Sequence, residues 1–191
     1  MIHICGPKTK VPDGSVVINT TSRSNNWSKG LSPFFCGPVD LYKWNGKEYI
    51  AKNVENAYQF SKVYYCHLDK EGNPSEEYFK WAEKGWNSDR AFRYPMGKGV
   101  SPAYSFWNGE KLTYIEARKK IYIPIYSKAV VRTDAYNKLV EMIDILGDVW
   151  LWDFDGYDHR AYNMDYDEVI NSTVRKMGHA FVIAMLLEKY L

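Results

Sequence analysis

The most informative segment of this chain is NVENAYQFSK, residues 53–62. Asn53 is a preferred helix N-cap residue, and the pattern after it predicts a helix from residue 53 to about residue 68. Positions i, i+4 and i+7 lie on one face of a helix, so Glu55, Gln59 and Lys62 are predicted to form a narrow polar stripe. Apolar and aromatic residues fill most of the remaining circumference, which is typical of a buried helix.

Two interpretations of this stripe are open. Periodicity alone favours a solvated stripe, because charged residues on a helix usually face water. The alternative is a cleft that holds something polar, because a carboxylate, an amide and an amine pack poorly among aromatic side chains. Desolvation favours the neutral, nucleophilic form of a lysine amine, and a nearby carboxylate can transfer protons. Spacing does not decide between the two.

The segments on either side predict a helix-rich α+β domain with a small β-hairpin or sheet. Strands are predicted at residues 16–19, 41–44, 48–51 and 149–154, with Asn45-Gly46 as the hairpin turn. Further helices are predicted from Ser75 to about Gly85, over 110–123 with a kink or end at Pro124, from Thr133 to 145, and over 166–190. Residues 20–31, 32–38, 89–104 and 155–167 are predicted loops. With no repeat and no linker, residues 1–191 are predicted to form one domain.

The composition of the 191 residues is ordinary for a globular protein, with 46% hydrophobic and 25% charged residues, and it excludes a disordered chain. The aromatic content, 16 Tyr, 8 Phe and 7 Trp, is high. Such side chains suit a core and also a pocket that stacks flat rings. The high aromatic content is compatible with a nucleotide-type ligand but does not show that one binds.

The charge is nearly balanced, with a net charge of +2 and a pI of about 8.3. Dedicated nucleic-acid-binding domains are usually more basic than this. The basic run Arg118-Lys119-Lys120 is best explained as a solvated helix face, and contact with a phosphate or a nucleic-acid end is the alternative.

Cysteine and histidine spacing predicts neither a disulfide framework nor a metal site, and we expect no cofactor. The three cysteines form no CxxC pair, and the four histidines lack zinc-ligand spacing. The N-terminus has no signal-peptide pattern, and no run of about 18 apolar residues occurs. A cytoplasmic protein without membrane contact is therefore expected.

The order of the motifs resembles the NADAR family, also called YbiA-like N-glycosidases. Members show a Leu-Ser-Asn-Phe-like loop and then a helix that reads (Thr/Ser)-Val-Glu-His-x-(Tyr/Phe)-Gln-x-x-Lys. The chain has LSPFF at residues 31–35, a predicted hairpin, and then the helix, whose matching residues are Val54, Glu55, Tyr58, Gln59 and Lys62. Asn56 replaces the usual His, and Pro33 replaces the usual Asn.

Later blocks resemble the family more loosely, and the similar blocks span about residues 17–187. Trp107 precedes a predicted helix that contains Arg118 and Tyr122, as a family Trp does. WDFDG at residues 152–156 is similar to a late Trp-Gly segment with an acidic residue, and GHAF at 178–181 is similar to the start of the closing helix.

The resemblance implies an enzyme that hydrolyses the N-glycosidic bond between a ribose and a base. One implied substrate is ADP-ribose on guanine bases of nucleic acid, removed to oppose an ADP-ribosylating toxin. A phage member acting in counter-defence in the host cytoplasm would fit a divergent, solitary domain. The alternatives are a phosphoribosylated pyrimidine intermediate of riboflavin synthesis, a non-catalytic module that binds ADP-ribose or a partner protein, and a structural component with no pocket at the stripe.

The resemblance also implies catalytic residues. Lys62 would attack the anomeric carbon and hold the ribose as a Schiff base, and Glu55 would handle protons. Asp153 and Asp155 would stabilise developing positive charge. The alternatives are an ion-paired surface lysine, a carboxylate placed in the first turn by the helix dipole, and ordinary acidic turn residues.

Substrate-binding residues are implied in the same way. Gln59 would orient ribose hydroxyls beside Tyr58, and Trp107 would stack on the base or belong to the core. The remaining candidates are Ser32 and Phe34 in the loop before the hairpin, and Arg93 and Lys98 in a glycine-bearing loop that meets phosphates or is simply solvated.

Overall fold

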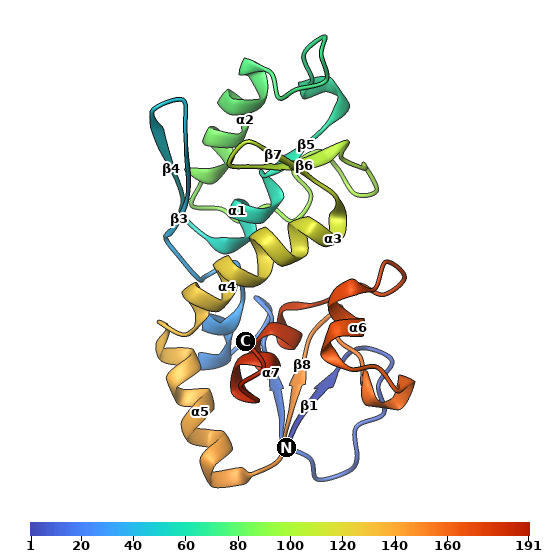
Figure 1. Cartoon of the computed structure of the whole chain (residues 1–191). Helices are drawn as coiled ribbons and strands as arrows, with labels where there is room; N and C mark the ends of the chain where they lie inside the picture. Colours follow the sequence, from blue (N-terminus) through green and yellow to red (C-terminus); the bar gives the residue numbers. More distant parts are fainter. The chain divides into compact units, whose positions relative to one another are not determined.

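The computed structural model describes all 191 residues and confirms an α+β protein in which helices and small sheets alternate (Figure 1). Contacts between residues divide the chain into two compact units. The first unit comprises Met1–Cys36 and Tyr126–Leu191, and the second unit comprises Gly37–Ile125. Each unit is described by itself, and the single domain over residues 1–191 stays a prediction. No helix combines the length and the apolar character needed to cross a membrane.

The first unit contains a three-stranded parallel sheet in the order β1-β8-β2. Its strands are β1 Ile2–Cys5, β2 Val17–Asn19 and β8 Val149–Trp152. The sequence predicts β2 and β8 correctly, although β8 ends two residues earlier than expected. It misses β1, because this four-residue strand exists only through its pairing with β8, far away in sequence.

The first unit also contains 3₁₀ turns and α-helices, and α7 packs on β1 and β8. They are the 3₁₀ turn η1 Trp27–Leu31, α5 Asp134–Leu146, the 3₁₀ turn η4 Arg160–Tyr162, α6 Tyr166–Asn171 and α7 His179–Leu187. The predicted cap Thr133 is confirmed for α5, where its hydroxyl accepts a hydrogen bond from the Tyr136 amide. The predicted helix over 166–190 is wrong. α6 ends at Asn171, residues 172–177 are not helical, and α7 begins only after Gly178.

The second unit begins with the predicted hairpin, β3 Val39–Trp44 and β4 Lys47–Ala51. Asn45 and Gly46 both have positive φ, 47° and 78°, as the tight turn requires. The short helix α1 Val54–Gln59 and the longer helix α2 Glu76–Trp86 follow. Ser75 caps α2 as predicted, because its hydroxyl accepts from the Tyr78 amide.

A second sheet, in the order β5-β6-β7, completes this unit. Its strands are β5 Lys62–Val63, β6 Tyr104–Trp107 and β7 Glu110–Leu112, and the 3₁₀ turn η2 Tyr65–His67 follows β5. The predicted helix over 53–68 is therefore too long. α1 ends at Gln59, the Ser61 hydroxyl bonds the Tyr58 carbonyl at 2.7 Å, and Lys62 pairs with Ser105 in the sheet.

The predicted helix over 110–123 begins too early. Asn108 and Gly109, with φ of 46° and 88°, form a second tight turn, and residues 110–112 pair with β6. Thr113 then caps α3 Tyr114–Ala117 in a capping box with Glu116.

The helical segment continues past Pro124, so the predicted end at this residue is wrong. A π-helical segment, η3 Arg118–Tyr122, follows α3, and α4 Ile123–Val130 continues through the proline. A π-turn displaces the hydrogen-bond register by one residue, which accommodates a residue without an N–H.

The aromatic excess is used chiefly in the core of the second unit. Trp86 and Tyr78 are fully buried, and Phe106 packs edge-to-face on Tyr78 and Phe79. Gly85 lets α2 approach α1 closely, because a Cβ there would lie 2.1 Å from the Phe60 ring. The ring cluster fixes α1 against α2 and the sheet.

Candidate functional site

The candidate site is built on α1. The Asn53 side chain caps this helix by accepting the Asn56 amide at 2.8 Å, and fully buried Val54 and Ala57 hold its inner face. Glu55 and Gln59 occupy another face, four residues apart. Both are buried, at 7% and 9% exposure, so the solvated-stripe interpretation is wrong for these two residues.

A continuous chain of hydrogen bonds links the three predicted polar residues. Gln59 Nε2 donates to Glu55 Oε1 at 3.0 Å, and Lys62 Nζ donates to Gln59 Oε1 at 2.7 Å. The amide thus holds a carboxylate at one end and an amine at the other. The prediction that these three residues lie together is confirmed, but its reason is wrong for Lys62. This residue belongs to β5 and not to the helix, and its side chain reaches back to Gln59.

The Lys62 amine also lies on an aromatic face. Its Nζ is 4.8 Å from the centre of the Tyr58 ring, and the Tyr58 ring in turn packs at 5.0 Å on Tyr122. Lys62 and Tyr58 are both half-buried, so the amine lies between a buried carboxamide and an aromatic ring and retains some access to solvent.

Arg118 also belongs to this cluster, although the sequence pattern predicts that it is exposed to solvent. The solvated-face interpretation holds for Lys119 and Lys120, but Arg118 is only 3% exposed. Its guanidinium donates to the Tyr114 hydroxyl at 2.9 Å and lies over that ring. Burial raises the pKa of Tyr58 strongly; Tyr114 and Glu55 raise it further, and Arg118 opposes the shift. The α3–η3 segment therefore places a buried cation near the α1 face.

Trp107, Arg93 and Lys98 also belong to the second unit. Trp107 is half-buried and packs edge-to-face on Tyr42 at 4.9 Å, so it lies at the border of the aromatic core. Arg93 lies over the Tyr94 ring, and Lys98 is exposed between two glycines. Their roles toward a substrate stay predictions.

The other predicted site residues belong to the first unit. Ser32 is buried, and its hydroxyl accepts a hydrogen bond from the Phe34 amide at 3.4 Å. Phe34 is half-buried. Asp153 and Asp155 follow the carboxyl end of β8, where ligand sites commonly form in parallel sheets.

Asp153 is part of a buried polar network. Its Oδ2 lies 3.0 Å from His179 Nδ1 and accepts the Ala180 amide at 3.2 Å, and its Oδ1 accepts the Asp155 amide at 3.4 Å. Burial alone would raise the pKa of Asp153, but the charge and hydrogen bond of His179 and the two backbone amides together lower it. Gly178 is required beside it, because a Cβ there would lie 2.2 Å from Oδ2.

The far side of the His179 ring faces Thr20. His179 Nε2 lies 2.8 Å from the Thr20 carbonyl and 2.9 Å from its hydroxyl, which itself donates to the Trp152 carbonyl. Both groups therefore accept from Nε2, which must carry a proton. This network ties the ends of β2 and β8 to the start of α7. It gives Asp153 a structural role, while the catalytic roles of Asp153 and Asp155 stay predictions.

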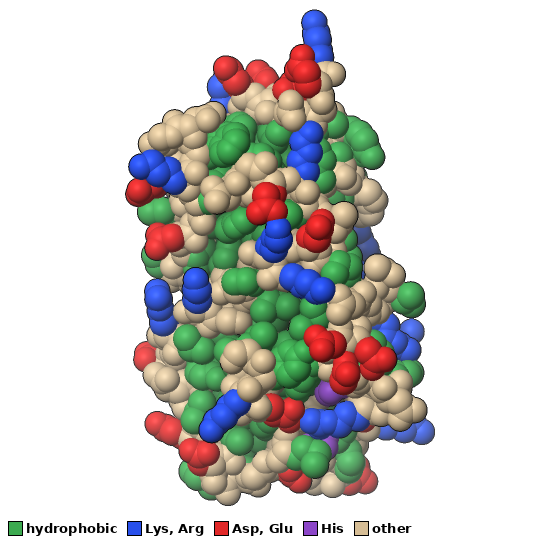
Figure 2. All heavy atoms as spheres, in the orientation of Figure 1, with side chains coloured by type: hydrophobic (Ala, Val, Ile, Leu, Met, Phe, Trp, Pro, Cys, Tyr) green, Lys and Arg blue, Asp and Glu red, His purple; other side chains and the backbone are tan.

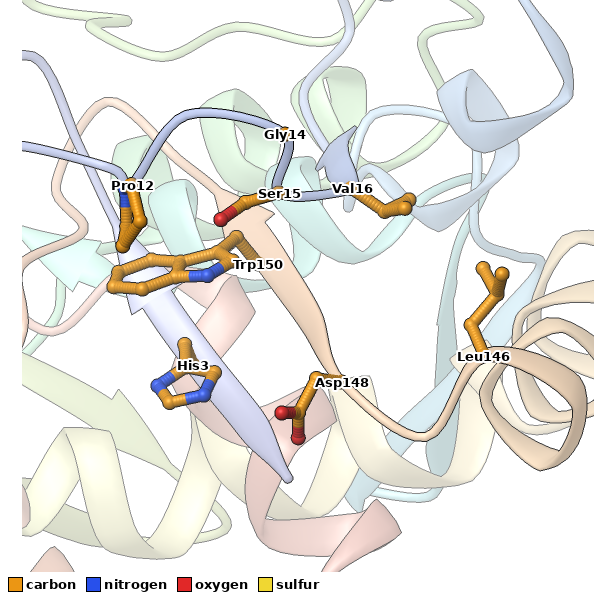
Figure 3. Close-up of a pocket in the computed structure, with 8 residues that line it drawn as sticks. All are labelled: His3, Pro12, Gly14, Ser15, Val16, Leu146, Asp148 and Trp150. Atoms are coloured by element: carbon orange, nitrogen blue, oxygen red, sulfur yellow. The ribbon is translucent and has the colours of Figure 1, made fainter.

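A pocket of about 410 Å³ lies at the opposite end of the first unit's sheet (Figure 3). Its lining residues are His3, Pro12, Gly14, Ser15, Val16, Leu146, Asp148 and Trp150. His3 stacks on Trp150 at 4.5 Å, and Asp148 is ion-paired with the N-terminal amine. The pocket borders the amino ends of the strands, whereas ligands of open parallel sheets bind at the carboxyl ends. We assign it no function.

Neither a metal centre nor a known relative assigns a function to this chain. No group of three or more His, Cys, Asp or Glu side chains has an arrangement that could hold a metal ion. No family model, curated protein or solved structure matches the chain.

Proposed function

We propose that this protein is an N-glycosidase that removes ADP-ribose from guanine bases in nucleic acid. The observation that carries the proposal is the hydrogen-bonded chain Glu55–Gln59–Lys62, which joins a buried carboxylate to a half-buried amine through one amide. These are the groups needed for covalent catalysis at an anomeric carbon, a nucleophile and a proton carrier held in fixed positions.

Lys62 is the nucleophile in this mechanism. Its Nζ contacts Gln59 Oε1 and the Tyr58 ring, and an amine attacks only in its neutral form, so a base must first take a proton from it. Attack at the anomeric carbon forms a C–N bond and breaks the bond to the base. The glycosylamine then opens to a Schiff base, and water hydrolyses it to release the sugar and the free amine.

Glu55 carries the protons. As a carboxylate it takes the proton from the attacking amine, and as an acid it returns a proton to the departing base, so that the base leaves neutral. Gln59 holds the two groups in register, and its amide is a donor and acceptor suited to ribose hydroxyls. The Tyr58 ring offers a flat surface beside the amine.

Turnover of three substrates tests the proposal. The full chain is incubated with ADP-ribosylated DNA, ADP-ribosylated RNA and a phosphoribosylated pyrimidine, and mass spectrometry detects the released sugar. Release from either nucleic acid supports the proposal, and release from the pyrimidine alone reassigns the substrate. No release from any of them refutes a glycosidase. An ADP-ribosylating toxin added beforehand extends the same assay to toxin antagonism, which we propose as the biological role.

Borohydride trapping tests the covalent step. Reduction during turnover should attach the sugar irreversibly to the peptide that contains Lys62. Lys62→Arg should abolish both the adduct and turnover, because the guanidinium is not a nucleophile. Lys43→Arg, a matched change at an exposed lysine of the same unit, should alter neither. Normal turnover by Lys62→Arg would refute the role of this amine.

A further inference from the structure

Charged side chains of both signs are interspersed over the face of the molecule shown in Figure 2, without a broad area of one sign. The net charge of the whole chain is only +2. Any attraction for a polyanion must therefore come from a local group of residues. Residues 88–100, here named the anchored loop, are such a group.

The anchored loop is fixed to α1 by Asn56. This side chain is fully buried, and its Nδ2 donates to the carbonyls of Ser88 and Arg90 at 3.2 and 2.9 Å. Its Oδ1 accepts the Phe92 amide at 2.9 Å. Three hydrogen bonds from one amide thus define the path of the first part of the loop. The same helix carries Glu55 and Gln59 on a different face.

The anchored loop concentrates positive charge. It contains the basic residues Arg90, Arg93 and Lys98 and a single acidic residue, Asp89. Lys52 forms an ion pair with Asp89 at 2.7 Å, so the only negative charge of the loop is already compensated. Thirteen residues therefore hold as much net positive charge as the entire chain. Arg90 and Lys98 are exposed to solvent.

Aromatic rings alternate with these basic residues. The Arg90 guanidinium lies 5.3 Å from the Phe92 ring, and that of Arg93 lies 5.5 Å from the Tyr94 ring. Tyr94 is 44% exposed. Cationic groups that contact phosphates and rings that stack on bases are the two requirements for binding a single strand of nucleic acid.

We propose that the anchored loop binds single-stranded nucleic acid and that Asn56 is its positioning residue. Arg90 and Lys98 contact phosphates, and Tyr94 stacks on a base. The inference goes beyond the proposed glycosidase, because it concerns unmodified strands and requires no turnover. Its failure would leave the catalytic proposal intact, and the reverse also holds.

Fluorescence anisotropy of the full chain with labelled oligo(dT) and oligo(U), over a series of KCl concentrations, tests the phosphate contacts. Each phosphate contact contributes about 0.7 to the slope of log affinity against log salt for a single strand. Arg90→Gln with Lys98→Gln should therefore reduce the slope by about 1.4. Lys8→Gln with Lys10→Gln removes the same charge from exposed positions of the first unit and should not change the slope.

The other two roles have their own readouts. Tyr94→Ala should weaken binding about tenfold at unchanged slope, because stacking involves no counterion release. Asn56→Ala should weaken binding and reduce the slope, whereas Val54→Ala, a core change in the same helix, should lower stability only. Equal effects of these two helix variants would refute the positioning role.

Two results would overturn the proposal as a whole. One is the absence of binding to both oligonucleotides by the unaltered protein at 50 mM KCl. The other is displacement of the strand by polyglutamate as readily as by unlabelled oligonucleotide at equal charge, which would show that the loop is a general polyanion or acidic-protein site.

Discussion

Asp153→Asn should destabilise the protein by about 3–5 kcal/mol, the usual cost of removing one partner of a buried ion pair. Asp153 and His179 are 3% and 8% exposed, and the carboxylate contacts His179 Nδ1 and the amides of Ala180 and Asp155. An asparagine retains one acceptor oxygen but places an NH₂ group against these donors. The loss amounts to a large fraction of a typical total stability of about 5–15 kcal/mol.

Urea unfolding monitored by circular dichroism measures this loss. In thermal unfolding of a chain of this size the melting temperature should fall by about 10 °C, because each kcal/mol of lost stability lowers it by about 2–4 °C. Asp158→Asn is the matched control, because its more exposed carboxylate accepts only the Arg160 amide. It should cost about 1 kcal/mol or less. Equal losses in the two variants would refute the structural role of the buried network.

The same carboxylate predicts a pH dependence with a definite sign. The folded protein holds the pKa of Asp153 below the ordinary value of about 3.9. Its contribution is therefore fully present above about pH 4 and is lost as the pH falls toward the lower folded pKa. The acid limb of the stability curve should be shallower for Asp153→Asn than for the unaltered protein. Parallel acid limbs would contradict this assignment.

Three further predictions concern other parts of the chain. Glu55→Gln should keep the hydrogen bond to Gln59 but reduce turnover about a hundredfold or more, because an amide cannot transfer protons. Steady-state kinetics with ADP-ribosylated DNA measures the loss of turnover, and an unchanged kcat would contradict the role of Glu55. Gly109→Ala should cost about 1–2 kcal/mol in urea unfolding, because φ is 88° and the new Cβ would lie 2.9 Å from the Trp44 ring; a neutral effect would show that the turn is not constrained. At pH 8 a thiol reagent should modify exposed Cys66 quickly and the buried thiols of Cys5 and Cys36 only after denaturation. Burial raises the pKa of Cys5 to about 11 and that of Cys36 to about 12. Fast modification of all three thiols would contradict the structure.

Local signals in the sequence predict those elements whose determinants are adjacent in the chain. The Asn45-Gly46 hairpin and the caps Asn53, Ser75 and Thr133 form as expected, because turn and cap residues act on neighbouring backbone groups. Asn108-Gly109 carries the same hairpin signal, and helix periodicity in the residues that follow obscured it.

Periodicity fails where pairing with a distant strand competes with the helix. Lys62 and Val63 continue the helical pattern of α1, yet they pair with β6 about 40 residues later in the chain. β1 is a strand only because β8 lies beside it. A local pattern does not register such a partner, because its contribution depends on residues far away in sequence.

The sequence by itself determined that Glu55 and Gln59 share a helix face and that the chain combines helices with small sheets. Only the tertiary structure decided that Lys62 reaches the same amide from a strand, that Arg118 is buried, and that Asp153 is surrounded by the protein's own donors. Residues four positions apart on a helix are neighbours because of backbone geometry alone. Burial and hydrogen-bond partners, in contrast, depend on which distant segments pack against a side chain, and no local spacing encodes that.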